Sequence, residues 1–123
     1  MDERIEKAFG VANFMATLSN QKRIILEEYN QQLIHYVDGA TFKVGPELIS
    51  FIKTLVDLKN TKNIVLVDDN NLPVLITDLK IFLKDIVEVY NTATAEYADR
   101  YNEIKIKRKV VDIVNLWVVL KVL

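Results

Sequence analysis

No glycine or proline follows Pro73, so the last 50 residues of the chain lack both. These two residues most readily interrupt a helix, so nothing in this stretch forces a break. Its apolar and aromatic residues also recur at helical spacing. The recurring positions are Leu79, Phe82, Leu83, Ile86, Tyr90, Ala93, Tyr97, Tyr101 and Ile104. We therefore expect a long helix that starts at residue 77, with Thr77 as its N-cap.

The first 33 residues predict another long helix. Apolar side chains recur there at spacings of three, four or a small multiple. These positions are Ile5, Phe9, Ala12, Ala16, Ile25, Tyr29 and Leu33. Acidic residues crowd the first turns, where they complement the helix dipole. We expect one continuous helix; the alternative is a second helix that starts within residues 17–21, with Ser19 as its cap.

The dipeptide Asp38-Gly39, flanked by β-rich residues, predicts the turn of a β-hairpin. A type I′ turn needs positive φ at both central positions, and Asp-Gly meets that need at low cost. We place the strands near residues 33–37 and 40–44. Gly45-Pro46 then opens a helix, because proline suits the first helical position, where its missing N–H would be unpaired anyway.

A second hairpin follows this helix. The stretch "IVLVDDNNLPVLI" predicts a strand over residues 64–67, a turn over residues 68–71 and a second strand around residues 74–76. Pro73 cannot donate a hydrogen bond to a neighbouring strand, so this second arm is expected at a sheet edge.

The helices that follow the two hairpins are similar in sequence. Aligned without gaps, "PELISFIKTLVDL" and "TDLKIFLKDIVEV" pair most apolar residues with apolar residues, and they also match a lysine and two acids. This similarity favours a pseudo-repeat of hairpin plus helix, near residues 33–58 and 64–89; chance similarity between amphipathic helices is the alternative. Two such hairpins are able to form one four-stranded antiparallel sheet. The expected fold class is α+β: long N- and C-terminal helices flank two β-hairpins and a middle helix, in a single domain over residues 1–123.

Composition restricts the classes of function. The chain of 123 residues has a formal net charge of −1, so its overall field does not point to nucleic acid or to an acidic membrane. It contains no cysteine, which excludes disulfides, thiolate zinc sites and cysteine nucleophiles. We expect no secretory signal, because the first residues are acidic and lack a clean apolar run, and no apolar run reaches the roughly 18 to 20 residues that span a bilayer. A cytoplasmic protein without a transmembrane segment is expected.

The sequence contains no recognisable catalytic motif. His35 is the only histidine, and a metal site there would need carboxylates from elsewhere. The oxygen-rich residues 68–71 lack the EF-hand pattern and are typical of a turn. The three glycines form no phosphate-binding loop, and neither serine lies in a Gly-x-Ser-x-Gly turn. We expect a non-catalytic protein with no cofactor or metal; a small enzyme that uses His35 with Asp68 or Asp69 is the weakest alternative.

One run of basic residues, "KIKRK", lies within the predicted C-terminal helix. Together with an arginine just upstream it forms a group of five cations: Arg100, Lys105, Lys107, Arg108 and Lys109. Tyr97 and Tyr101 precede the run, and aromatic rings are able to stack on bases. A nucleic-acid-associated regulatory protein is therefore the runner-up hypothesis. The competing interpretation is a solvated helix surface, because Asp99, Glu103 and Asp112 interleave with the cations.

The C-terminal stretch "VVDIVNLWVVLKVL" would be apolar around nearly its whole circumference as a helix. Such a helix has to be buried on all sides. As a strand it has high β-propensity but no clean alternation, so both conformations stay open. Burial against another subunit is the interpretation that we favour; folding back into the core and an in-plane membrane contact are the alternatives. The residues expected at the interface are Ile113, Leu116, Trp117, Leu120 and Leu123.

Two further stretches carry a resemblance: "EKAFGVANFMATLSNQKRIILEEYNQQLIHYVDGATFKVGPELISFIKTLVDL" and, after it, "VLVDDNNLPVLITDL". They resemble small uncharacterised proteins encoded by T4-like marine phages, over roughly residues 1–113. The resemblance brings no assigned catalytic or binding residue. It implies a viral protein in the cytoplasm of an infected bacterium that acts by binding or assembly. The final "NLWVVLKVL" lies outside the pattern, so the resemblance does not support the interface predicted there.

The function that these observations favour is that of a self-associating structural or adaptor protein without catalytic activity. Its partner is expected to be a further copy of the chain or another protein. We expect the two long helices to pack antiparallel, with a seam that extends into a dimer or a higher oligomer.

Overall fold

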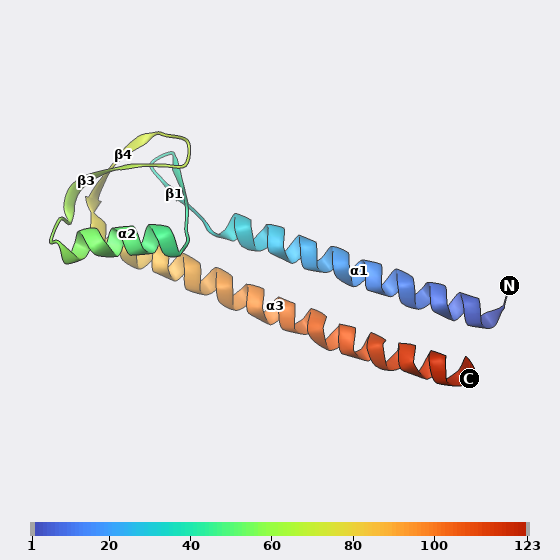
Figure 1. Cartoon of the computed structure of the whole chain (residues 1–123). Coiled ribbons are helices and arrows are strands. Elements are labelled where there is room, and N and C mark those ends of the chain that lie inside the picture. The colour runs from blue at the N-terminus through green and yellow to red at the C-terminus, as the bar shows by residue number, and fades with distance from the viewer. Residues whose placement is uncertain (1, 123) are drawn as a thin grey trace. The chain divides into compact units, whose positions relative to one another are not determined.

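The fold is α+β, as predicted (Figure 1). The computed structural model describes residues 2–122, without the side chains of Val111, Ile113, Leu116, Val119, Leu120 and Val122. Over these residues the chain forms three helices and two separate two-stranded sheets. It divides into two compact units: unit 1 combines the residues up to Glu28 with those from Glu96 onward, and unit 2 is Tyr29–Ala95. That the whole chain forms a single domain stays a prediction.

Helix α1 runs without a break over Glu3–Gln32, as the sequence favoured. The alternative restart within residues 17–21 does not occur. The hydroxyl of Thr17 donates instead to the carbonyl of Asn13, one turn earlier, at 3.0 Å, which ties this side chain to the helix backbone. At the start, the carboxylate of Asp2 accepts the N–H of Arg4 at 3.1 Å and acts as the cap.

The first hairpin pairs β1 (Ile34–Val37) with β2 (Ala40–Lys43) in antiparallel fashion. Asp38 has a φ of 47° and Gly39 a φ of 81°. Both central residues of the turn therefore have positive φ, which confirms the type I′ turn predicted from this dipeptide.

Helix α2 (Pro46–Asp57) begins with proline at its first position, directly after the N-cap Gly45, as predicted. Its C-terminal end is closed by two backbone bonds: Lys59 N–H donates to the carbonyl of Val56, and Asn60 N–H donates to the carbonyl of Leu55. This pattern is a Schellman motif, whose left-handed position is usually glycine. Here Lys59 occupies it, with a φ of 62°.

The second hairpin pairs β3 (Lys62–Val67) with β4 (Pro73–Asp78). The four-stranded sheet that the sequence allowed does not form, because the two hairpins make separate sheets. The second hairpin presents its turn, and not a strand, to β2. At that point the carbonyl of Thr41 accepts the N–H of Asp69 at 3.0 Å, and the N–H of Thr41 donates to the Asp68 carboxylate at 3.0 Å.

Helix α3 extends over Leu79–Val122. Its N-cap is Asp78 and not Thr77, because the Asp78 carboxylate accepts the N–H of Lys80 at 3.0 Å. The helix passes through residues 103–109 without interruption, so the helical interpretation of the C-terminal stretch is correct up to Val122. Among the helices as described, none has a stretch both long and apolar enough to cross a membrane.

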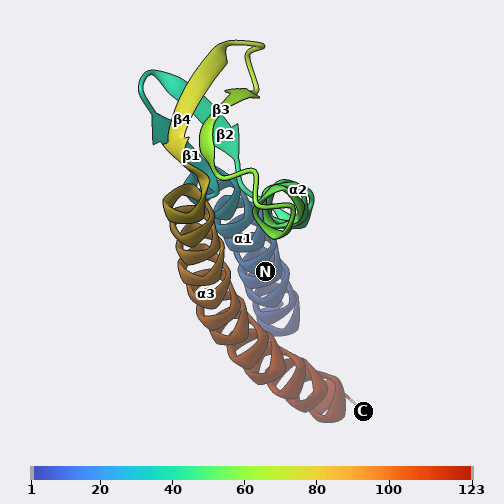
Figure 2. The same cartoon turned by 90° about the vertical axis from the view of Figure 1, so that its left-hand side faces the viewer.

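The core of unit 2 lies between the hairpins and the helices α2 and α3. Both hairpins are on the same side of α2 and of the first turns of α3 (Figure 2). Alternate residues of the strands point into this core, and the rings of Phe42 and Phe82 meet edge to face with centroids 5.3 Å apart. The buried members are Ala40, Phe42, Val44, Ile52, Leu66, Val74, Ile76, Leu79, Phe82 and Ile86.

The order of hairpin and helix occurs twice, but the residues matched in the sequence are not structurally equivalent. Phe51 is 54% exposed, whereas its counterpart Phe82 is 4% exposed. The alignment matches Pro46 with Thr77. Pro46 is the first residue of α2, whereas Thr77 precedes α3, which begins at Leu79. The two copies therefore share an arrangement of elements, and their apolar residues face different surroundings.

Unit 1 consists of two antiparallel helical segments, residues 3–28 of α1 and 96–122 of α3, which lie side by side in both views (Figures 1 and 2). The inward face of α1 alternates spacings of four and three residues, as in the seam of a coiled coil. Its buried and half-buried members are Val11, Met15, Leu18, Lys22 and Ile25. The apolar residues that the sequence emphasised near the N-terminus, Ile5 and Phe9, are exposed and lie off this seam.

Candidate functional site

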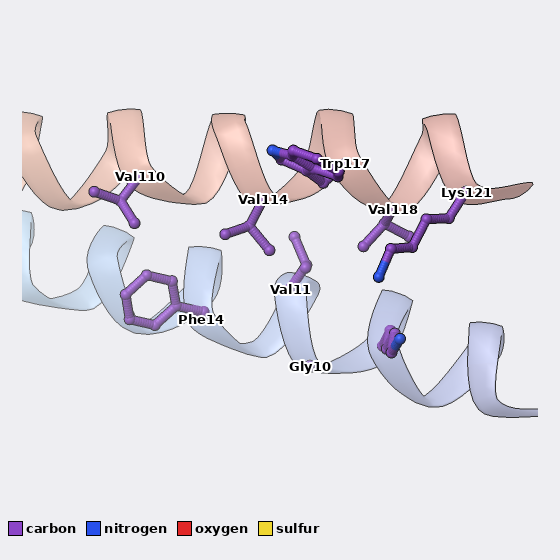
Figure 3. A pocket seen from close by; sticks show the side chains of 9 residues that line it. Gly10, Val11, Phe14, Val110, Val114, Trp117, Val118 and Lys121 are labelled. Carbon is purple, nitrogen blue, oxygen red and sulfur yellow. The ribbon is translucent and has the colours of Figure 1, made fainter.

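An apolar groove lies between the two helical segments of unit 1 and has a volume of about 500 Å³ (Figure 3). Helix α1 contributes Val11 and Phe14 to it. Helix α3 contributes Val110, Val114, Trp117 and Val118. Lys7 and Lys121 are the charged residues among its described lining. The groove is open, and most of these large apolar side chains are exposed to solvent.

The predicted interface residues are only partly within the described structure. The Trp117 side chain lines the groove and is 61% exposed. The side chains of Ile113, Leu116 and Leu120 lie outside the described residues, as does the whole of Leu123. Their placement at an interface stays a prediction.

The basic residues predicted as a nucleic-acid surface separate into three groups. Arg100 forms an ion pair with Glu28 of α1, so its charge is already compensated. Lys105 and Arg108 line a second pocket of unit 1. Lys107 and Lys109 are exposed on the same helix and do not line that pocket.

We call this second pocket the basic pocket; it has a volume of about 440 Å³. Its lining is Met15, Leu18, Ser19, Lys22, Tyr101, Ile104, Lys105 and Arg108. The ammonium groups of Lys22 and Lys105 lie 5.1 and 5.4 Å from the centroid of the Tyr101 ring. Both distances are within the range of cation–π attraction.

The phenol of Tyr101 reports the positive field in the basic pocket. A hydrogen bond from Lys22 is the largest cause of a pKa of Tyr101 below its usual 10.0, and the charges of Lys22, Lys105 and Arg108 act in the same direction. A group that loses its proton more readily than usual lies in surroundings that favour negative charge. The lining of the pocket thus carries three positive charges, those of Lys22, Lys105 and Arg108.

The Asp68 carboxylate, considered above as a catalytic candidate, organises a turn. It is 6% exposed, and it accepts N–H groups from Thr41 at 3.0 Å, Asn70 at 2.9 Å and Leu72 at 2.7 Å. The bonds from Thr41 and Leu72 are the main causes of a pKa of Asp68 below its ordinary value. Asp69 contributes its backbone N–H to the same junction. Turn formation thus accounts for this acidic pair.

His35 is half-buried and packs edge to face against the Phe82 ring, with centroids 5.8 Å apart. It lines a small pocket of about 190 Å³ together with Asp38, Asp78 and Asp85. Asp78 is paired with Lys62 at 2.9 Å. Within residues 2–122, no group of histidines and acids is arranged to hold a metal ion.

The sequence did not point to the contribution of α1 to either site. No motif in the sequence singles out Lys22, because it lies among polar residues, far along the chain from the basic run. The available signal was the spacing of Val11, Met15, Leu18 and Ile25, which places Lys22 on the seam that faces α3. The sequence does not indicate Phe14 either, since it does not belong to the apolar stripe of Ile5 and Phe9.

Comparison with known proteins gives no family for the chain. No family model matches its sequence, no curated protein matches it, and no solved structure matches its fold.

Proposed function

We propose that the protein self-associates through the apolar face of unit 1 and acts as a non-catalytic structural or adaptor component. The observation that carries the proposal is the open apolar groove, with Phe14 on one helix and Val110, Val114 and Trp117 on the other. Its occupant in this proposal is the same face of a second copy.

The hydrophobic effect supports this proposal. Removing apolar surface from water stabilises an association by about 25 cal/mol for each Å² buried. A contiguous exposed apolar patch is typical of an interaction surface, whereas single exposed apolar residues are common everywhere. The exposed apolar residues of the groove come from two adjacent helices, so they form one patch.

Symmetry favours a second copy as the occupant. In a two-fold dimer the same patch faces itself, so it has to be complementary to itself. Apolar helix faces meet this condition without matched charges, and two helical hairpins then complete a four-helix bundle. The lysines of the groove, Lys7 and Lys121, have long stems that let their charges remain in water at the edge of such a contact.

The resemblance to proteins of T4-like marine phages, which is a prediction from the sequence, would imply binding or assembly in the cytoplasm of an infected bacterium. It does not extend to the final residues, which include Trp117. The proposal adds which surface would be used. It places the contact on described residues of unit 1 and extends it, as the sequence predicted, to Ile113, Leu116, Leu120 and Leu123.

Trp117 offers a direct test, because it is the only tryptophan of the chain. Light scattering should give a mass above the 14.2 kDa of one chain, and the mass should fall on dilution. The emission of Trp117 should shift to the red over the same dilution, because dissociation exposes the indole to water. The double variant Phe14→Asp and Val110→Asp should weaken association by at least about tenfold, since it places charges in an apolar contact.

The matched control is Phe51→Asp, a change of the same kind at an exposed position on α2 of unit 2. It should leave the mass and the Trp117 emission unchanged. A monomer at every concentration, with Trp117 emission as red as that of free tryptophan, would sink the proposal. Association that is lost in the control and kept in the double variant would place the contact elsewhere and would equally contradict it.

A further inference from the structure

We propose that the basic pocket of unit 1 binds a phosphorylated small molecule, with Lys22, Lys105 and Arg108 around the phosphate. This site is separate from the apolar groove and does not depend on self-association. It also differs from the surface suggested by the basic run, because Lys22 comes from the other helix.

Charge is the first argument. Three cationic side chains from two helices converge on one pocket, and its described lining contains no carboxylate. The neighbouring acid Glu28 is engaged by Arg100. Like charges that line one pocket repel one another, and a bound anion relieves this repulsion. A phosphate group, with about two negative charges at neutral pH, matches three cations better than a single carboxylate does, and arginine and lysine are its usual ligands.

The remaining lining indicates what else the ligand contains. Leu18 and Ile104 are buried and form an apolar floor with the half-buried Met15. The hydroxyl of Ser19 also lines the pocket and is able to donate a hydrogen bond. A volume of about 440 Å³ falls within the range of about 300–1,000 Å³ typical of small-molecule sites. The ligand class is therefore a phosphate ester with an apolar or planar body, of the size of a nucleotide.

The positions of the other cations favour a small molecule over a nucleic acid. A polynucleotide backbone would be expected to use the whole basic run, since each neutralised phosphate adds to affinity. Lys107 and Lys109 do not line the pocket, and Arg100 is paired. The three cations that line the pocket therefore form one cluster, and not the extended row of charges that would follow a polynucleotide backbone.

Isothermal titration calorimetry tests the site with three probes at about 0.15 M salt: inorganic pyrophosphate, adenosine triphosphate and a 12-nucleotide oligothymidylate. Pyrophosphate should bind with one site per chain, and adenosine triphosphate should bind more tightly because its body reaches the apolar floor. Lys22→Gln and Arg108→Gln should each weaken both by at least about tenfold, since each removes a charge-assisted hydrogen bond. The control Lys107→Gln with Lys109→Gln removes two charges from the same helix and should leave affinity within about twofold.

Circular dichroism checks the helix content of each variant. If Lys22→Gln reduces it, the charge-preserving Lys22→Arg supplies the second test and should retain binding. Three results would overturn the proposal: no binding of either phosphate probe at millimolar concentration, equal losses in the control and the pocket variants, or tighter binding of the oligonucleotide with dependence on Lys107 and Lys109. The last result would indicate a nucleic-acid surface in place of a pocket.

Discussion

At the scale of single residues, Asp68 connects the two hairpins of unit 2. Thr41 sits on β2 at a position whose N–H and carbonyl point away from β1, toward the second hairpin. The carboxylate of Asp68 takes the place that a strand carbonyl would have, and its other oxygen holds the turn through Asn70 and Leu72. Thr41 is half-buried, and a backbone N–H that is shielded from water and has no partner is costly. The Asp68 side chain therefore supplies the contact that a neighbouring strand would otherwise make.

Acid should weaken this junction. The pKa of Asp68 lies below its ordinary 3.8, so the folded state takes up the proton less readily than the unfolded chain. The stabilisation is fully present above about pH 4 and is lost as the pH falls through the lower pKa of the folded state. Asp68→Asn should lower the melting temperature at neutral pH by several degrees, because in either orientation its amide nitrogen faces backbone N–H groups that the carboxylate accepts, and it should reduce the further loss on acidification.

Thermal melts followed by circular dichroism at about pH 7, pH 4 and pH 2.5 measure both effects. Asp69→Asn is the matched control, because Asp69 uses its backbone N–H at the junction and the change leaves that group in place. Equal melting temperatures for Asp68→Asn and the parent chain would show that the carboxylate contributes nothing.

Lys59 is the second residue whose local geometry makes a prediction. It occupies the left-handed position after α2 with a φ of 62°, where a side chain costs about 1–2 kcal/mol relative to glycine. Lys59→Gly should therefore raise the free energy of unfolding by about 0.5–1 kcal/mol, after the added flexibility of the unfolded chain is subtracted. Urea denaturation measures this change. Lys84→Gly, at an exposed position in the interior of α3, should instead destabilise by about 1 kcal/mol, and a loss of stability in Lys59→Gly would contradict the strain argument.

At the scale of elements, α1 carries two different apolar faces. The seam that faces α3 includes Leu18 and Ile25, whereas Ile5, Phe9 and Ile24 are exposed. A helix with one buried stripe needs only that stripe to be apolar. The second face and the open groove beside Phe14 therefore leave apolar surface of the helical hairpin in contact with water. This surface is available for the contact between copies that we propose.

Two adjacent isoleucines of α1 allow a test of the difference between the buried seam and the exposed apolar face. Ile25 is 5% exposed and Ile24 is 42% exposed. Ile25→Ala should lower the free energy of unfolding by about 2–4 kcal/mol through lost burial and a residual cavity, and Ile24→Ala should lower it by about 0.5 kcal/mol or less at dilutions where the chain is monomeric. Chemical denaturation followed by helix content measures both. Similar losses for the two variants would mean that the seam is assigned to the wrong face.

At the scale of the whole molecule, sequence predictions succeeded where short-range chemistry decides. The Asp38-Gly39 turn and the start of α2 at Pro46 each depend on backbone preferences of neighbouring residues. The helical spacing of α3 was clear up to Ile104, whereas the conformation of the C-terminal stretch stayed open in the sequence and is helical in the structure. A four-stranded sheet did not form, because pairing between two hairpins depends on which of their strand edges lie next to each other in the folded chain. Phe51 and Phe82, which are matched in the sequence alignment, differ in burial for the same kind of reason, since burial depends on which segments pack against a residue.

The sequence by itself determined the elements, since glycine, proline, caps and apolar spacing act over a few residues. Only the tertiary structure decided which residues from distant parts of the chain share a site: Lys22 with Arg108 in the basic pocket, and Phe14 with Trp117 in the groove. The physical reason is that periodicity shows that a helix has a face, whereas the partner of that face is set by packing between segments that no local preference encodes.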